Sequence, residues 1–308
     1  MSKEVIAILC SDLHLSLTPP IARAGEKNWF EAMARPLSEL SNLAHSYRCP
    51  VLCSGDIFDR WNPPPELINF AIKHLPKMYA VPGQHDLPFH SMEDIQRSAY
   101  WTLCEAGVVE HCIGEQWRGG FFVGGPNPQF FIGGYGWGEK IASIANVPTD
   151  RISIALVHEY HWIDGSGFEG APTESKITAN SKQFQGWDVV LIGDNHTPFQ
   201  CKVGDTLIYN PGGFMRRKSD EDNRLPQVGL LYSDKTLEIH IMDTEKDSFV
   251  PQVREEVEQT GIKNFVRQMG KLQGAELDYV NALQKVLRGG DISERVRELL
   301  NQAIEECK

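Results

Sequence analysis

Five short polar clusters in this sequence each follow directly on an apolar segment, and each carries carboxylate or imidazole side chains. They are Asp12-Leu13-His14, Gly55-Asp56-Ile57-Phe58-Asp59, Gly83-Gln84-His85-Asp86, the single His158, and Gly193-Asp194-Asn195-His196. Carboxylate oxygens and imidazole nitrogens are common ligands of divalent metal ions in proteins. Any one of these clusters is typical of an ordinary turn, but all five in one chain indicate a shared metal site.

The apolar segments in front of these clusters have the composition of buried strands. Residues 5–10, 51–53, 78–81, 152–157 and 189–192 are short and rich in β-branched side chains, which is typical of strands covered on both faces. Open α/β sheets build their sites on the loops that follow the carboxyl ends of such strands. Residues 28–47, with Pro36 inside, 66–74 and 91–106 predict intervening helices, so the sequence favours an α/β fold.

The rest of the chain predicts further strands and a separate C-terminal segment. Residues 121–123 and 130–132 are aromatic runs separated by Gly and Pro, and they predict a hairpin. Residues 206–209, 228–232 and 237–242 predict consecutive strands, so we expect two packed sheets with helices outside. Glycines at 274 and 289–290 then divide the C-terminal segment into three predicted helices, and apolar residues follow helical spacing in the last of them. We therefore expect a catalytic domain at residues 1–245 and a helical appendage at residues 251–308, which either packs on the domain or binds a partner.

Composition narrows the class of protein. The chain has 308 residues and a formal net charge of −11, which counts against a protein that coats DNA with a basic face. An acidic metal cage is compatible with phosphate, because bound divalent ions supply the positive charge. No segment approaches the roughly 18 apolar residues of a membrane span, and the first apolar run is too short for a signal-peptide core. We therefore expect a cytoplasmic protein with no membrane partner.

The order of the five clusters resembles the pattern of the calcineurin-like metallophosphoesterase superfamily. That pattern is Asp-x-His, Gly-Asp-x-x-Asp, Gly-Asn-His-Asp, a single His and Gly-His-x-His, and the resemblance covers roughly residues 4–215. It implies a four-layer α/β/β/α sandwich of two mixed sheets, which agrees with the predicted strands. Within the superfamily the sequence most resembles the SbcD-type nucleases, which work with an SbcC-type coiled-coil ATPase. Residues 11–15, 55–59, 81–86 and 210–217, followed by a final strand pair, carry this closer resemblance.

The resemblance implies a role for each polar residue of the clusters. Asp12, His14 and His196 would hold one divalent ion, Gln84, His158 and Asp194 would hold a second, and Asp56 would bridge the two. His85 would face the scissile phosphate, paired with Asp86, and would protonate the leaving oxygen or stabilise developing charge. Two such ions can clamp the attacking and leaving oxygens and supply a nucleophile at neutral pH.

Two residues of the second set depart from the superfamily pattern. Gln84 stands where Asn is expected, and Asp194 stands where His is expected. Gln is longer than Asn by one methylene, and Asp brings a negative charge and a harder oxygen ligand. Together these changes favour manganese, or magnesium, over zinc, and they predict an enzyme stimulated by manganese.

Residues after the last cluster bear on the substrate. Asn210, Arg216 and Arg217 lie in and after a Pro-Gly-Gly loop, and we expect them to bind substrate. The first functional hypothesis is a DNA nuclease, with the C-terminal helices contacting an SbcC-type ATPase and the chain forming a homodimer. The second is a small-nucleotide phosphodiesterase or phosphoprotein phosphatase, which an acidic surface suits. The third is a non-catalytic subunit with a decayed second metal site, against which the retained ligands argue.

Overall fold

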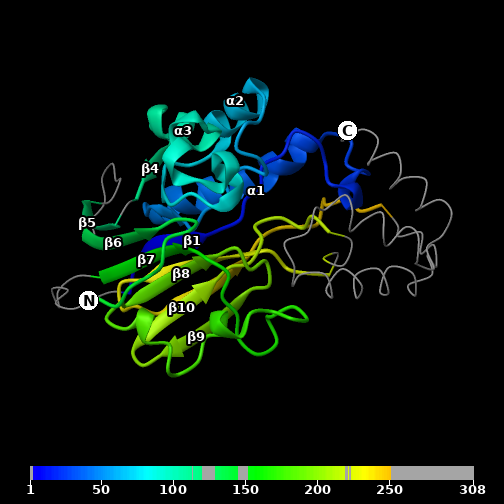
Figure 1. Cartoon of the computed structure of the whole chain (residues 1–308). Coiled ribbons are helices and arrows are strands. Elements are labelled where there is room, and N and C mark those ends of the chain that lie inside the picture. Colours follow the sequence, from blue (N-terminus) through cyan, green and yellow to red (C-terminus); the bar gives the residue numbers. More distant parts are fainter. Residues whose placement is uncertain are drawn as a thin grey trace, which may run out of the picture. The chain divides into compact units, whose positions relative to one another are not determined.

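The computed structural model describes residues 3–112, 114–119, 129–144, 152–218, 221 and 223–250 (Figure 1). These residues belong to one compact unit, Met1–Pro251. The helical segment expected at residues 251–308 lies outside the described residues, so that part of the domain division stays a prediction. Within the described residues, no helix is long and apolar enough to span a membrane.

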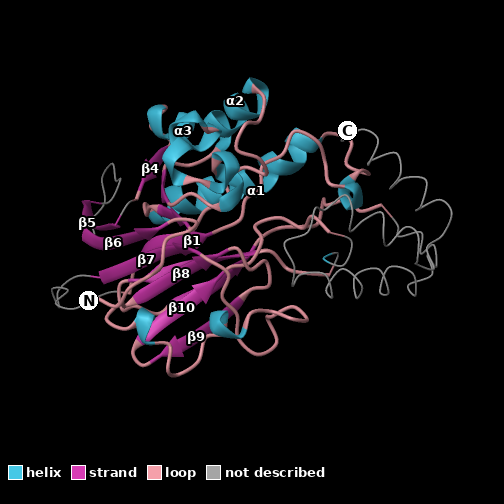
Figure 2. Cartoon of the chain, viewed as in Figure 1, coloured by secondary structure: helices cyan, strands magenta, loops and turns pink. Residues whose placement is uncertain are grey.

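Two six-stranded sheets form the centre of this unit (Figure 2). The first has the order β12 (Leu237–Ile241), β11 (Gln227–Tyr232), β1 (Val5–Cys10), β2 (Val51–Cys53), β3 (Met78–Ala80) and β4 (Val109–His111). The second has the order β5 (Gly114–Gly119), β6 (Gln129–Tyr135), β7 (Ile152–His158), β8 (Val189–Gly193), β10 (Thr206–Asn210) and β9 (Phe199–Val203). Each sheet combines parallel and antiparallel pairs. The predicted fold class, two mixed sheets with helices, is confirmed.

Three α-helices accompany the first sheet and lie on one side of it in Figure 1. They are α1 (Trp29–Tyr47), α2 (Pro65–His74) and α3 (Ala99–Glu105). The side chain of Asn28 accepts from the backbone N–H of Glu31 and caps α1, which continues through Pro36 as one helix. The single helix expected at residues 91–106 is instead a 3₁₀ helix, Met92–Arg97, followed by α3, because Ser98 caps a new helix start.

Each face of the two sheets is buried against a different apolar cluster. In β1, Ile8 and Cys10 pack with the helices, whereas Ala7 and Leu9 pack between the two sheets. The outer face of the second sheet packs on Phe184 and other residues of the connection between β7 and β8. In that connection the described segments contain only two short 3₁₀ helices, Thr173–Ser175 and Lys182–Phe184. Burial on both faces explains why β1 reads as a continuous apolar run.

The expected hairpin is only partly placed by the structure. Residues 130–132 lie in β6, as expected, but its antiparallel partner is β5 at Gly114–Gly119. Residues 121–123 lie outside the described residues. The sequence around β5 is polar and carries Gly at both ends, so it lacks the apolar alternation that predicts a strand.

Candidate metal centre

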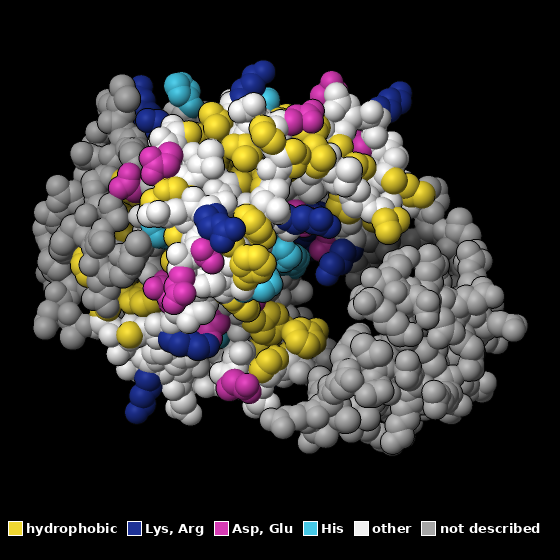
Figure 3. Space-filling model, turned by 45° about the horizontal axis from the view of Figure 1, so that its top comes forward, with side chains coloured by type: hydrophobic (Ala, Val, Ile, Leu, Met, Phe, Trp, Pro, Cys, Tyr) yellow, Lys and Arg dark blue, Asp and Glu magenta, His cyan; other side chains and the backbone are white. Residues whose placement is uncertain are grey.

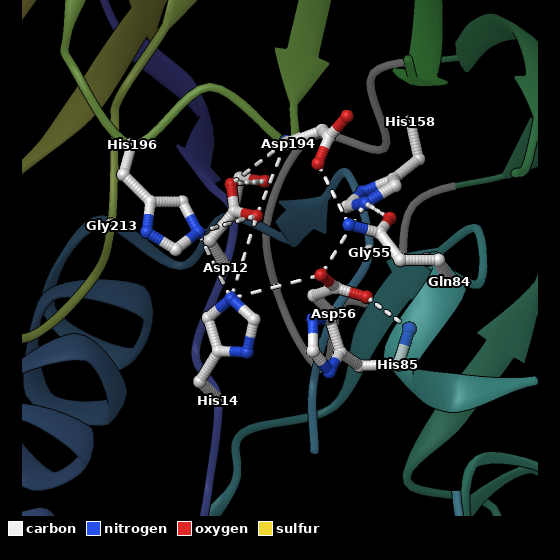
Figure 4. A network of polar contacts seen from close by, with 12 residues as sticks. Asp12, His14, Gly55, Asp56, Gln84, His85, His158, Asp194, His196 and Gly213 are labelled. Atoms are coloured by element: carbon white, nitrogen blue, oxygen red, sulfur yellow. Dashed lines mark hydrogen bonds and ion pairs between the residues drawn. The ribbon is translucent and has the colours of Figure 1, made fainter. Parts of the chain in front are cut away.

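Loops at the carboxyl ends of strands from both sheets meet at one place (Figure 4). Asp12 and His14 follow β1, Asp56 follows β2, and Gln84 and His85 follow β3 of the first sheet. His158 ends β7, and Asp194 and His196 follow β8 of the second sheet. The structure therefore brings together all seven predicted metal ligands and His85, although 184 positions separate Asp12 from His196 in the sequence (196 − 12).

One ligand group consists of Asp12, His14 and His196, as the resemblance implies. The Nε2 atoms of His14 and His196 lie 3.0 Å apart. Oδ1 of Asp12 lies 3.9 Å from Nε2 of His14 and 3.7 Å from Nε2 of His196. Two imidazole nitrogens and one carboxylate oxygen that converge in this way can coordinate one divalent ion.

Asp56 lies between this group and His158. Its Oδ2 atom is 3.7 Å from Nε2 of His14 and 3.5 Å from Nε2 of His158. Oδ1 of Asp56 accepts from the backbone N–H of His85 at 2.9 Å, but Oδ2 is buried without a hydrogen-bond partner. A buried acceptor without a partner is costly unless something binds it, so the carboxylate has the position and the open coordination capacity of a bridging ligand.

His158, Gln84 and Asp194 form a second set of contacts. Nε2 of His158 lies 2.6 Å from Oε1 of Gln84, and Nε2 of Gln84 donates to Oδ1 of Asp194 at 2.7 Å. Nδ1 of His158 donates to the carbonyl of Ser54, which leaves Nε2 as the atom that faces the site. His158 also groups with Asp12 and Asp56 as potential ligands. Gln84 and Asp194, the two residues that depart from the superfamily pattern, therefore contact each other.

The backbone around these ligands is held in unusual conformations. Asp12, His14, Asp56 and Asp194 have φ angles of 53°, 45°, 52° and 81°, a left-handed region that few non-glycine residues adopt. Loops also approach closely: a Cβ on Gly83 would lie 2.1 Å from Oδ1 of Asp56, and one on Gly193 would lie 2.2 Å from the carbonyl of Ser54. Such strain concentrates at functional sites, and here it fixes the directions of four ligands.

Burial and neighbouring charges shift the pKa values of the ligands. Burial raises the pKa of Asp12 to about 7 and lowers the pKa of His14. Burial opposes ionisation of Asp56, but His158 and then His14 outweigh it and hold the pKa of Asp56 well below its usual range. Burial likewise opposes the charge on His158, yet Asp56 raises the pKa of His158 to about 10. Buried carboxylates thus draw positive charge to this place, where a metal cation would supply it.

His85 is positioned by backbone contacts. Its Nδ1 atom donates to the carbonyl of Asp59 at 2.9 Å, and its ring lies edge-on to His14 with centroids 4.9 Å apart. Because Nδ1 is engaged, Nε2 is the atom that can exchange a proton with a substrate. The residue that holds His85 is therefore Asp59, through its carbonyl.

The expected pairing of Asp86 with His85 is corrected by the structure. The carboxylate of Asp86 is completely buried and accepts from the backbone N–H groups of Ile57, Phe58 and Gly83 at 3.2, 3.0 and 3.0 Å. Burial and then the nearby Asp56 raise the pKa of Asp86 to about 7. Asp86 therefore ties the Asp56 loop to the Gly83 turn and acts as a positioning residue.

Two of the three predicted substrate-binding residues have structural contacts instead. Nδ2 of Asn210 donates to the carbonyls of Asn195 and Thr197, at 2.7 and 3.4 Å, and Oδ1 accepts from Gly212. Arg216 is buried, and its Nη2 lies 2.9 Å from Oδ2 of Asp247. Sequence position could not reveal these contacts, since Asp247 lies 31 residues further along the chain.

Arg217, by contrast, lies at the metal centre. Its Nη1 donates to the carbonyl of His14, and its Nη2 contacts Oδ1 of Asp59 at 2.7 Å. Asp59 also groups with His14 and His85 as a potential ligand set, a role that was not predicted for it. The sequence did contain a signal for this role, because Asp59 is the second Asp of the Gly-Asp-x-x-Asp cluster.

Sequence reasoning also missed Asn195. Its side chain links the His196 loop to the carbonyls of His161 and Ser166.

The metal centre reaches the molecular surface. The side chain of His196 is 32% exposed, and Gln84 and His85 are half-buried. Figure 3 shows histidine side chains at the surface with Lys and Arg side chains next to them and hydrophobic side chains around them. A phosphate group could therefore approach the ligands from solvent.

Comparison with known proteins agrees with this geometry. The sequence matches the family model for calcineurin-like phosphoesterases over residues 7–198, more than half of the 308-residue chain. This chain belongs to the calcineurin-like phosphoesterase family. The match begins in β1 and extends just beyond His196, so it contains every predicted metal ligand. Among curated proteins, no sequence matches this phosphoesterase.

Solved structures similar to this phosphoesterase include an archaeal phosphodiesterase, the calcineurin-like phosphoesterase YfkN from Bacillus subtilis and a 5′-nucleotidase from Candida albicans. Their sequence identities are 13%, 11% and 11%, and their TM-scores are 0.37, 0.45 and 0.45. The alignments cover 78%, 77% and 88% of this chain, and 99%, 90% and 59% of those chains. Likeness at this level does not identify a substrate.

The family consists of hydrolases that act on phosphoric esters with divalent metal ions, and the residues of this phosphoesterase fit such ions. The decisive feature is the unpartnered, buried Oδ2 of Asp56, which lies within 3.7 Å of an imidazole nitrogen on each side. Asp12, His14 and His196 would hold one ion and His158, Gln84 and Asp194 the other, with Asp56 shared.

The contacts of Asp86 predict a stability defect when it is replaced. Asp86→Ala leaves three buried backbone N–H groups without an acceptor, and each such donor costs about 1–3 kcal/mol. We expect the free energy of unfolding to fall by at least about 3 kcal/mol in urea titrations. As a control, Asp94→Ala removes an exposed carboxylate from the neighbouring 3₁₀ helix. It should change the free energy of unfolding by less than about 0.5 kcal/mol. Equal effects of the two substitutions would contradict the positioning role.

Proposed function

We propose that this phosphoesterase is a two-metal phosphodiesterase that cleaves DNA, similar to the SbcD-type nucleases. The observation that carries the two-metal assignment is the open Oδ2 of Asp56 between the imidazoles of His14 and His158. Bound there, divalent ions would neutralise the phosphate charge and supply a nucleophile at neutral pH. The oxygen-rich second set, with Gln84 and Asp194, favours manganese or magnesium over zinc.

The residues of this chain have distinct tasks in that reaction. His85 keeps Nδ1–H on the Asp59 carbonyl, so its imidazolium form would give the Nε2 proton to the leaving oxygen and become the neutral imidazole. Asp56 holds the His85 loop through the backbone N–H of His85. Arg217 joins the carbonyl of His14 to the carboxylate of Asp59, so it would fix the His14 segment relative to Asp59, whose carbonyl holds His85.

DNA as the substrate is supported by the sequence around the site. Residues 11–15, 55–59, 81–86 and 210–217 carry the resemblance to SbcD-type nucleases. Lys218 is exposed beside this segment, and its charge contributes to lowering the pKa of His196, after burial. By the same resemblance, the segment at residues 251–308 would bind an SbcC-type coiled-coil ATPase, and the chain would form a homodimer.

A small-nucleotide phosphodiesterase is the second candidate, and the arginine contacts favour it. Arg216 is engaged with Asp247 and Arg217 with Asp59, so the charges of these two arginines are largely neutralised. Long polyanions are usually held by many Lys and Arg contacts to phosphate, whereas a small ester needs few. The net charge of −11 points in the same direction.

One assay separates these functions. The pure protein with Mn²⁺ is incubated in parallel with single-stranded DNA, duplex ends, cyclic nucleotides and a generic phosphodiester, with His85→Ala beside it. Cleavage of DNA that His85→Ala reduces by about 10²–10⁴-fold would support the nuclease. Turnover of small esters alone would favour the second candidate. If no substrate shows turnover that depends on His85, the nuclease and the small-nucleotide phosphodiesterase are both refuted, and a non-catalytic subunit is favoured.

A further inference from the structure

An exposed aromatic residue lies on the loop that carries Gln84 and His85. Phe89 follows these residues by a few positions, and its side chain is 74% exposed, more than any other aromatic side chain of the described residues. Leu87 and Pro88, immediately before it, are buried. The loop thus anchors two apolar residues in the interior and presents the third to solvent, where an aromatic ring gains little burial energy.

The backbone at Phe89 is strained. Phe89 has φ 52° and ψ 27°, and His90 has φ 57°, conformations that bulky L-residues rarely adopt. Nδ1 of His90 lies 3.0 Å from the carbonyl of Gln84, and the backbone N–H of His90 donates to Leu87 at 3.2 Å. These contacts hold the strained turn against the ligand loop. Neither core packing nor a hydrogen bond of the ring accounts for an aromatic residue here.

Trp61 completes an aromatic rim with Phe89. The two ring centroids are 6.0 Å apart, with planes at 46°. Trp61 follows Asp59 on the loop after β2, and its carbonyl accepts from the backbone N–H of Ala99. The aromatic rim, Trp61 and Phe89, therefore joins the loop that carries Asp56 to the loop that carries His85.

We propose that the aromatic rim stacks on a nucleobase next to the scissile phosphate. This inference rests on the proposed function and specifies its substrate as a phosphodiester that carries bases. Aromatic side chains bind bases through their π-faces with little sequence preference, which requires an exposed ring such as Phe89. Trp61 and Phe89 lie on the same loops as Asp56 and His85, and this shared position is why we assign the rim to the base that adjoins the scissile phosphate. A rim of apolar rings also suits an acidic protein, because stacking needs no basic groove.

The test compares a single-stranded oligonucleotide with a chain of the same length made of abasic residues, both with Mn²⁺. We expect Phe89→Ala to raise KM for the oligonucleotide by about 5–150-fold, the equivalent of about 1–3 kcal/mol per stacked base, and to leave KM for the abasic chain unchanged. Phe89→Trp should restore the wild-type KM. Tyr47→Ala removes an exposed aromatic ring at the end of α1 and should change neither KM.

The outcomes test base stacking separately from the proposed phosphodiesterase activity. If the wild type cleaves both chains and Phe89→Ala changes both KM values alike, base stacking is refuted while the phosphodiesterase stands. If the wild type cleaves neither chain, the proposed function fails and the inference fails with it. Phe89→Gly gives an independent readout: it relieves the left-handed strain, so Tm should rise while oligonucleotide KM also rises. A fall in Tm would show that the ring serves folding instead.

Discussion

Asp56→Asn should severely weaken both metal binding and hydrolysis while preserving the fold. Asn keeps an oxygen for the backbone N–H of His85, which Oδ1 of Asp56 accepts at 2.9 Å. It places a neutral group where Oδ2 now lies between His14 and His158. Loss of a residue that merely supports a ligand costs about 10–100-fold in metal affinity. We expect loss of the shared ligand to cost at least about 100-fold in Mn²⁺ affinity by calorimetry, with turnover reduced at least as much.

The control for this substitution is Asp188, which precedes β8 at the end away from the metal ligands. It accepts from the backbone N–H of Ser153 at 2.9 Å and pairs with Lys235 at 2.6 Å. Asp188→Asn makes the same chemical change far along the strand from Asp194, so Mn²⁺ affinity should remain at the wild-type value. Wild-type Mn²⁺ affinity in Asp56→Asn would refute the bridging assignment.

The ligands were predictable because each one follows an apolar run. Val5–Cys10 and Val189–Gly193 are buried on both faces, and such runs are recognisable without tertiary information. Parallel strands then place the residues that follow them at one edge of the sheet. Asp12 and His196 follow strands of different sheets, β1 and β8, so their assignment to one ion came from the resemblance to the superfamily pattern.

The roles of Asp86 and Arg216 were not predictable for a physical reason. An Asp after a His is compatible with a catalytic pair, and only the fold shows that its carboxylate accepts backbone N–H groups from the Asp56 loop. Arg216 is adjacent to Arg217 in sequence, yet one contacts Asp247 and the other Asp59. Both assignments depend on which distant segment packs nearby, and hydrophobic periodicity carries no information on that. The same limit applies to β5, which pairs with β6 without a strand pattern of its own.

Restoring the superfamily residues at positions 84 and 194 should shift the metal preference towards zinc. Gln84→Asn with Asp194→His replaces a carboxylate by an imidazole and shortens the amide by one methylene. Imidazole suits zinc, whereas carboxylate and carbonyl oxygens suit manganese and magnesium. In competition calorimetry we expect the ratio of Zn²⁺ to Mn²⁺ affinity at this set to rise at least tenfold, about 1.4 kcal/mol. An unchanged ratio would mean that Gln84 and Asp194 do not contact the ion.

The two substitutions should also be strongly non-additive. Nε2 of Gln84 donates to Oδ1 of Asp194 at 2.7 Å, while Oε1 of Gln84 lies 2.6 Å from Nε2 of His158. Gln84→Asn alone shortens the donor and leaves the Asp194 charge less compensated, and Asp194→His alone leaves the amide without its acceptor. Directly contacting residues typically couple by about 0.5–3 kcal/mol. A double-mutant cycle on Mn²⁺ affinity should give a coupling in that range. A coupling near zero would show that Gln84 and Asp194 act independently and that their contact does not affect Mn²⁺ affinity.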